Sequence, residues 1–196
     1  MSINLLEKIQ QNLGYPALQK IDPNIQQETR EWQRSEGHSF AQAAIPAVLT
    51  GMYRFVQSDE GALEILADGH DASWINKIFE KDTEKVVESI AGYGQLHEQD
   101  TAIKMNTIAV EAVKIIKENL AADASIKDVK IFLTAQKNNI LLYLPPVLNI
   151  GGLLDDDSLD DNTNKMEGPV SSLIQSIGSV FSSPVTATEI KSDKAG

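Results

Sequence analysis

Apolar residues recur every three or four positions along most of the chain, which is the period of one face of an α-helix. The first such stripe runs from Ile3 to Leu13. Asp22 followed by proline is a typical helix start, and it predicts a polar helix from Pro23 to Ser35. A third stripe, from Ser39 to Gln57, contains Pro46, which either kinks that helix or begins it. The pattern predicts helices from the start of the chain onward.

Short helices are predicted in the next part of the chain. Residues that typically cap helix N-termini precede each apolar group, namely Ser58, Asp71, and either Asp82 or Thr83. Glycines follow two of these groups, at Asp68-Gly69 and at Gly92-Tyr93-Gly94. Glycine suits the left-handed position that often ends a helix. We therefore expect helices of only a few turns here, one of which carries Trp74 to Phe79.

The longest helix is predicted from Gln99 to Ala122, because apolar residues recur there without an interior glycine or proline. Its expected inward residues are Ile103, Ile108, Val110, Val113, Ile116 and Leu120. Ser125-x-x-Asp128 resembles a capping box with aspartate in place of glutamate, and it predicts the start of another helix. The most hydrophobic stretch, Ile140 to Leu148, contains Pro145-Pro146 and is predicted to be a buried or interfacial helix broken at those prolines.

These elements predict an all-α fold, a compact bundle of short and medium helices with a flexible C-terminal tail. The helical domain is predicted over residues 1–154. An acidic linker over 155–169 then precedes a single amphipathic helix over 170–181, and residues 182–196 have the composition of a disordered tail.

Charge and composition narrow the classes of function. The chain has 196 residues and a formal net charge of −11, which opposes binding to the phosphates of nucleic acids. It contains no cysteine, so disulfides, thiol nucleophiles and thiolate metal sites are excluded. The absence of cysteine is consistent with a protein of a reducing compartment. No signal peptide or membrane-spanning run is recognisable, and the expected location is the cytoplasm.

The order of the central motifs resembles the YidB-like bacterial family, also called domain of unknown function 937. The matching residues are Ile45-Pro46-Ala47-Val48-Leu49, Ser58-Asp59-Glu60-Gly61-Ala62 and His70-Asp71-Ala72-Ser73. The resemblance spans roughly 43–152, although Ala72 stands where the family usually has glycine and the glycine-rich segments of relatives are missing. It implies a compact all-helical bacterial domain without an established enzymatic activity or transferable catalytic residues.

Metal binding has weak candidates in two acidic segments. Asp160, Asn162 and Asn164 follow the spacing with which an EF-hand loop begins. Lys165 and Ser171 stand where that loop needs glycine and glutamate, so a solvated linker is the simpler interpretation. Asp68 and Asp71 offer further oxygen ligands, but helix capping also explains them. No catalytic residue and no cofactor site is predicted, and the chain is not expected to be an enzyme.

Interaction surfaces are the better hypothesis. Two segments hold much apolar surface, and their candidate contact residues are Leu141, Leu144 and Leu148 in the first and Leu173, Ile174, Ile177 and Phe181 in the second. Core packing is the alternative for the first segment, and docking within the chain for the second. The predicted function is a non-enzymatic interaction protein, an adaptor or assembly component that binds a protein partner or itself.

Two other functions stay open from the sequence. A module that binds a small ligand or a divalent metal is the first alternative. A helix-turn-helix nucleic-acid binder is less favoured, because Lys77, Lys81 and Lys85 are offset by neighbouring carboxylates.

Overall fold

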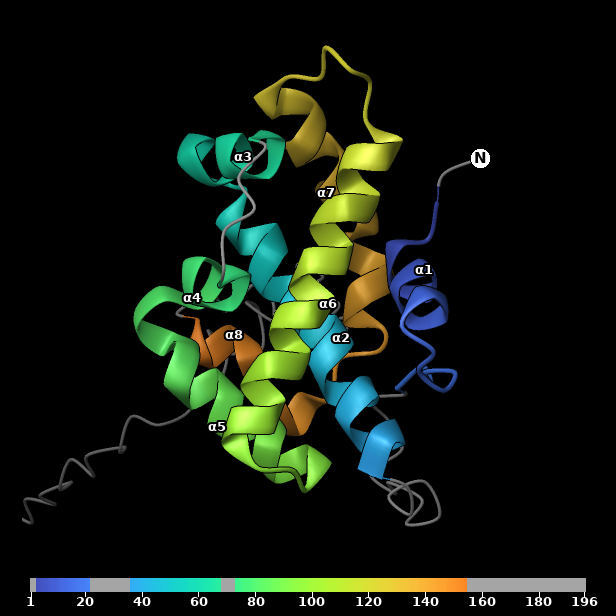
Figure 1. Ribbon diagram of the computed structural model, residues 1–196, viewed down its shortest axis with the longest axis vertical. Helices are drawn as coiled ribbons and strands as arrows, with labels where there is room; N and C mark the ends of the chain where they lie inside the picture. Colours follow the sequence, from blue (N-terminus) through green and yellow to red (C-terminus); the bar gives the residue numbers. More distant parts are fainter. Residues whose placement is uncertain (1–2, 22–35, 68–72, 155–196) are drawn as a thin grey trace, which may run out of the picture. The chain divides into compact units, whose positions relative to one another are not determined.

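The computed structural model describes residues 3–21, 36–67 and 73–154. The chain divides into two units, residues 1–163 and 164–196, and every described residue belongs to the first. The described secondary structure is helical throughout and includes no strand, which confirms the predicted all-α bundle (Figure 1). The predicted helix over 23–35, the residues Asp68 to Asp71, and everything predicted beyond Leu154 lie outside the described residues.

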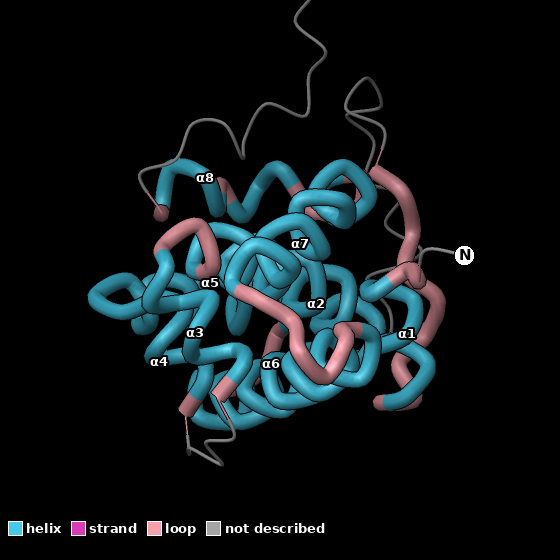
Figure 2. The backbone as a smooth tube through the Cα atoms, turned by 90° about the horizontal axis from the view of Figure 1, so that it is seen from above, coloured by secondary structure: helices cyan, strands magenta, loops and turns pink. Residues whose placement is uncertain are grey.

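The described helices occupy the following ranges: α1 (Leu5–Asn12), α2 (Glu36–Phe55), α3 (Asp59–Leu66), α4 (Trp74–Phe79), α5 (Thr83–Gly94), α6 (Glu98–Asn119), α7 (Ile126–Leu141) and α8 (Ile150–Leu153). Two single turns of 3-10 helix join them, η2 (Glu80–Asp82) and η3 (Pro146–Leu148). Figure 2 shows the same helices from above.

Helix α2 is the centre of the core. It packs against α1, α4, α5, α6 and α7, and every residue from Ser39 to Met52 is buried. A helix that is apolar on all sides must be surrounded in this way. Pro46 lies inside α2 and does not begin it. Pro46 cannot donate a backbone hydrogen bond, and this costs free energy. Burial of its neighbours Ile45 and Ala47, both 0% exposed, offsets that cost.

Two buried glutamines attach the N-terminal segment to this core. The side chain of Gln42 on α2 accepts from the Gln19 amide at 2.9 Å and donates to the Gln19 carbonyl at 3.0 Å and the Tyr143 carbonyl at 2.9 Å. Gln136 on α7 accepts from the Leu5 amide and donates to the Ile3 carbonyl. Each buried amide thereby satisfies backbone groups that have no partner within a helix.

Several predicted helix starts are confirmed. The Ser58 hydroxyl caps α3 by accepting from the Gly61 amide at 2.9 Å. The capping box at the start of α7 is present, with the Asp128 carboxylate accepting from both the amide and the hydroxyl of Ser125. The N-cap of α4 is Ser73 rather than the predicted Asp71, because the helix begins two residues later.

Helix α5 ends at Gly94, within the predicted segment Gly92-Tyr93-Gly94. The residue in the left-handed conformation is not a glycine, as predicted, but Gln95, with a φ of 54°. Gly94 serves packing instead: a Cβ there would lie 3.1 Å from Cα of Phe40 on α2. The glycine therefore permits close approach of the two helices.

The inward face of α6 was predicted with two errors. Ile103 and Val110 are 67% and 45% exposed, whereas Met105, Ile108 and other residues of that helix are buried. Five residues of α-helix turn the side chain by about 140°, so Ile103 and Ile108 cannot lie on one face. The buried face follows Thr101, Met105, Ile108 and Ala112.

Candidate functional site

A shallow hollow lies over α5 and the 3-10 turn η3. Its volume is about 630 Å³, and its lining comprises Lys85, Glu88, Ser89, Gly92, Tyr93, Val147 and Leu148. Residues more than fifty positions apart in the sequence meet here because η3 packs against α5. The size falls within the usual range for ligand and peptide sites, but the hollow is open to solvent.

A second hollow adjoins the first at the turn between α5 and α6. Its volume is about 580 Å³, and it is lined by Glu88, Ala91, Gly92, Gln95, Leu96, His97, Glu98 and Gln99. Glu88 and Gly92 line both hollows, so the two form one surface along α5. We call the residues that line these two hollows the α5 face.

The apolar centre of the α5 face comes from η3. Pro146 begins this turn, where its missing N–H is tolerated, and Asn149 ends it in the left-handed conformation. One turn of 3-10 helix points neighbouring side chains in different directions: Leu148 is 3% exposed, whereas Val147 is 68% exposed. Val147 is therefore an apolar side chain that the described part of the chain leaves in solvent, beside the half-buried Tyr93.

Gly92 lies where the two hollows meet. A Cβ at this position would meet no atom of another described element within 4 Å. The helical glycines Gly51 and Gly94 differ because a Cβ there would press on Phe79 and on Phe40. Gly37 of α2 has the same open space as Gly92, but it lines neither hollow. Glycine within a helix costs about 0.5–1 kcal/mol relative to alanine. The fold of the described chain gives no reason for glycine at position 92.

The charge on the α5 face is predominantly negative. Glu88 and Glu98 are exposed, and neither forms an ion pair within the described ranges. Lys85 lies 3.6 Å from the buried carboxylate of Asp82, which offsets its charge locally. The face thus presents two unpaired carboxylates: Glu88 shares the larger hollow with Val147, and Glu98 lines the second hollow.

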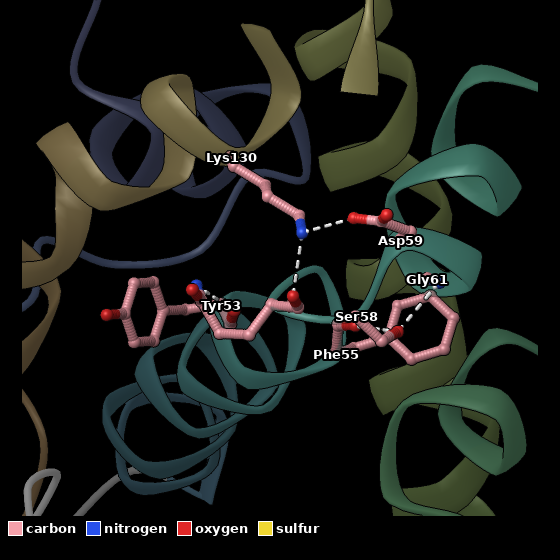
Figure 3. A network of polar contacts seen from close by, with 7 residues as sticks. Tyr53, Phe55, Ser58, Asp59, Gly61 and Lys130 are labelled. Atoms are coloured by element: carbon pink, nitrogen blue, oxygen red, sulfur yellow. Dashed lines mark hydrogen bonds and ion pairs between the residues drawn. The ribbon is translucent and has the colours of Figure 1, made fainter. Parts of the chain in front are cut away.

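Another polar cluster lies where α2, α3 and α7 meet, and Figure 3 shows how it connects these helices. The Lys130 ammonium donates to the Gln57 carbonyl at 2.8 Å and to Asp59 Oδ1 at 2.7 Å. Ser58 donates to the Phe55 carbonyl at 3.1 Å while it caps α3. Each contact satisfies a helix end or joins two helices, so the cluster is structural.

The metal candidates from the sequence, Asp68, Asp71, Asp160, Asn162 and Asn164, all lie outside the described residues. Within residues 3–21, 36–67 and 73–154, no group of three or more acidic, histidine or cysteine side chains is placed to hold a metal ion. In the same part of the chain, no helix has the length and apolar character needed to cross a membrane.

The interaction candidates in the first apolar segment are core residues. Leu141, Leu144 and Leu148 are 8%, 3% and 3% exposed. These side chains pack in the core, as the core-packing interpretation of this segment has it, and the expectation that they form an exposed interaction surface is corrected. The physical reason is that α7 ends at Leu141, before the prolines, so that helical spacing no longer decides which side chains face outward. The candidates Leu173, Ile174, Ile177 and Phe181 lie outside the described residues.

The sequence pattern does not single out Val147 or Gly92 as functional residues. Val147 belongs to the segment that was singled out, and its position after two prolines was the available signal that helical spacing stops there. Gly92 was interpreted only as part of a helix end. Among the described residues, the other exposed large apolar side chains line neither hollow, and they are Leu63, Ile103, Val110, Ile131 and Leu142.

Comparisons of the chain with protein-family models, curated proteins and solved structures find no match.

Proposed function

We propose that this chain is a non-catalytic helical interaction protein, an adaptor or assembly component, that binds a protein partner through the α5 face. The observation that carries the proposal is the helical Gly92 at the junction of two hollows, with no neighbour from the described elements. A helical glycine that packs against no other described element of its chain is accounted for if a partner's backbone approaches it closely. The exposed Val147 supplies an apolar anchor beside it.

The charge distribution supports a protein rather than a nucleic acid as partner. The ammonium of Lys77 lies 2.6 Å from Glu64, and Lys85 lies near Asp82. Lys77 and Lys85 are thus already paired with carboxylates, and binding to phosphates requires cations that displace counterions. A cytoplasmic location, expected because no signal peptide or membrane-spanning run is recognisable in the sequence, and membership of the YidB-like family stay predictions that accompany this proposal.

The proposal is tested by partner capture from a lysate of the source cell with two matched variants. Val147→Asp places a charge in the α5 face, and Ile131→Asp places the same charge at a 56% exposed site on α7. A protein retained by the wild type and by Ile131→Asp, but lost with Val147→Asp, is the expected result. Equal retention by all three proteins contradicts the α5 face as the binding surface. Circular dichroism checks that both variants are folded.

A further inference from the structure

We infer that the partner segment that occupies the α5 face is a basic amphipathic α-helix of another protein. One apolar side chain of that helix contacts Val147 in the larger hollow, and its lysines or arginines pair with Glu88 and Glu98. This inference rests on the proposed function, and it adds the chemical class and the conformation of the partner.

The architecture favours a helix over an extended peptide. An extended peptide typically adds a strand to a free sheet edge, and the described residues offer no sheet. The α5 face follows α5 from Lys85 to Tyr93, a length of about 12 Å at 1.5 Å per residue. About two turns of a partner helix fit along this length, which is the helix-in-groove mode of recognition.

Small residues allow that helix to lie close to α5. Ser89 and Gly92 are separated by three positions, so they lie on the same side of α5, and both line the larger hollow. Packed helices are usually 8–10 Å apart, with the distance set by the side chains at the contact. With no side chain at Gly92, the partner backbone reaches the lower end of this range.

The charges select a basic partner. Glu88 lines both hollows and Glu98 lines the second, and neither carboxylate is paired within the described part of the chain. A cationic helix neutralises both. A second copy of this chain is disfavoured because it brings together two molecules that each carry a net charge of −11.

A synthetic amphipathic peptide of leucine and lysine, about sixteen residues long and carrying a fluorescent label, serves as the probe in an anisotropy titration. The full chain is compared with Glu88→Gln plus Glu98→Gln, which removes both carboxylates from the α5 face. The matched control is Glu60→Gln plus Glu118→Gln, which removes two exposed carboxylates elsewhere. The expected result is binding that weakens about fivefold in the first double variant and less than twofold in the control.

Three outcomes would overturn the inference: no binding of the peptide, equal weakening in both double variants, or equal binding of a peptide with glutamate in place of lysine. Equal weakening would mean that only the net charge attracts the peptide. The proposed function fails separately, in the capture experiment. Suppose that Val147→Asp abolishes capture of a partner while the peptide does not bind. The α5 face is then supported as the binding surface, and the inference that its partner is a basic helix is wrong.

Discussion

Gly51 of α2 packs against the side chain of Phe79 at the end of α4. A Cβ at Gly51 would lie 2.7 Å from Cζ of that ring and 2.8 Å from Cγ2 of Ile78, both closer than packed atoms allow. Phe79 is 1% exposed, so its ring has no free space to move into. The glycine is therefore what permits α4 to pack so closely on the central helix.

The Gly51→Ala variant should consequently lower the free energy of unfolding. The added methyl group overpacks the contact between α2 and α4, at a cost of about 1–3 kcal/mol. Urea denaturation followed by circular dichroism measures the change. The comparison is Gly37→Ala, because a Cβ at Gly37 meets no described atom within 4 Å. A loss of stability of the same size in both variants would contradict the packing explanation.

Replacement of Gln42 by leucine should destabilise the protein, although leucine is apolar and similar in size. The buried amide of Gln42 satisfies both backbone groups of Gln19 and the carbonyl of Tyr143. Their loss leaves polar groups without partners, which costs about 1–3 kcal/mol. Gln57→Leu is the control, since Gln57 is exposed and its side chain donates only to the Tyr53 carbonyl. Thermal unfolding should show a clear loss for the first variant and little change for the second.

The ion pair between Lys130 and Asp59 should contribute only a small coupling energy. Asp59 is 71% exposed at its side chain, and exposed pairs typically contribute about 0.2–1 kcal/mol. A double-mutant cycle with Lys130→Met and Asp59→Asn measures this value. Lys130→Met should cost more than Asp59→Asn, because the ammonium also donates to the Gln57 carbonyl. Equal costs would show that this second hydrogen bond contributes nothing.

The capping box of α7 should contribute stability that depends on pH. Hydrogen bonds from the Ser125 hydroxyl and amide hold the pKa of Asp128 below its ordinary value of 3.8. A carboxyl whose pKa is lower in the folded state stabilises the fold above the unfolded pKa. This contribution is lost as the pH falls through the folded pKa. The difference in Tm between wild type and Asp128→Ala should therefore be largest near neutral pH and shrink below pH 3.8. A difference that does not vary with pH contradicts this assignment.

Helices α1 to α7 could be predicted from local chemistry, whereas the short α8 was not predicted. Helix starts are marked by side chains that satisfy backbone amides a few residues away, as at Ser58 and at the pair Ser125 and Asp128. Such short-range signals are visible in the sequence. The burial of α2 also follows from its composition, because its apolar residues leave no polar face. Both features depend on residues close together in the chain.

The α5 face could not be predicted in this way. It depends on η3 packing against α5, a contact between distant segments that no local pattern encodes. Val147 and Leu148 are both apolar, and only the conformation of η3 decides that one is exposed and the other buried. Gly92 likewise has the same identity as Gly94, and only the three-dimensional surroundings distinguish a glycine that packs from one that faces solvent.

The proposal that Gly92 serves the binding of a partner and not the fold is tested most directly by measuring stability and binding on a single variant, Gly92→Ala. We expect the stability of the variant to rise and its binding of the partner to fall. The free energy of unfolding rises by about 0.5–1 kcal/mol, because alanine is the better helix former and nothing described obstructs its methyl group. Capture of the partner retained by the wild type becomes weaker. A variant that loses stability, or one that retains the partner as well as the wild type does, contradicts the claim.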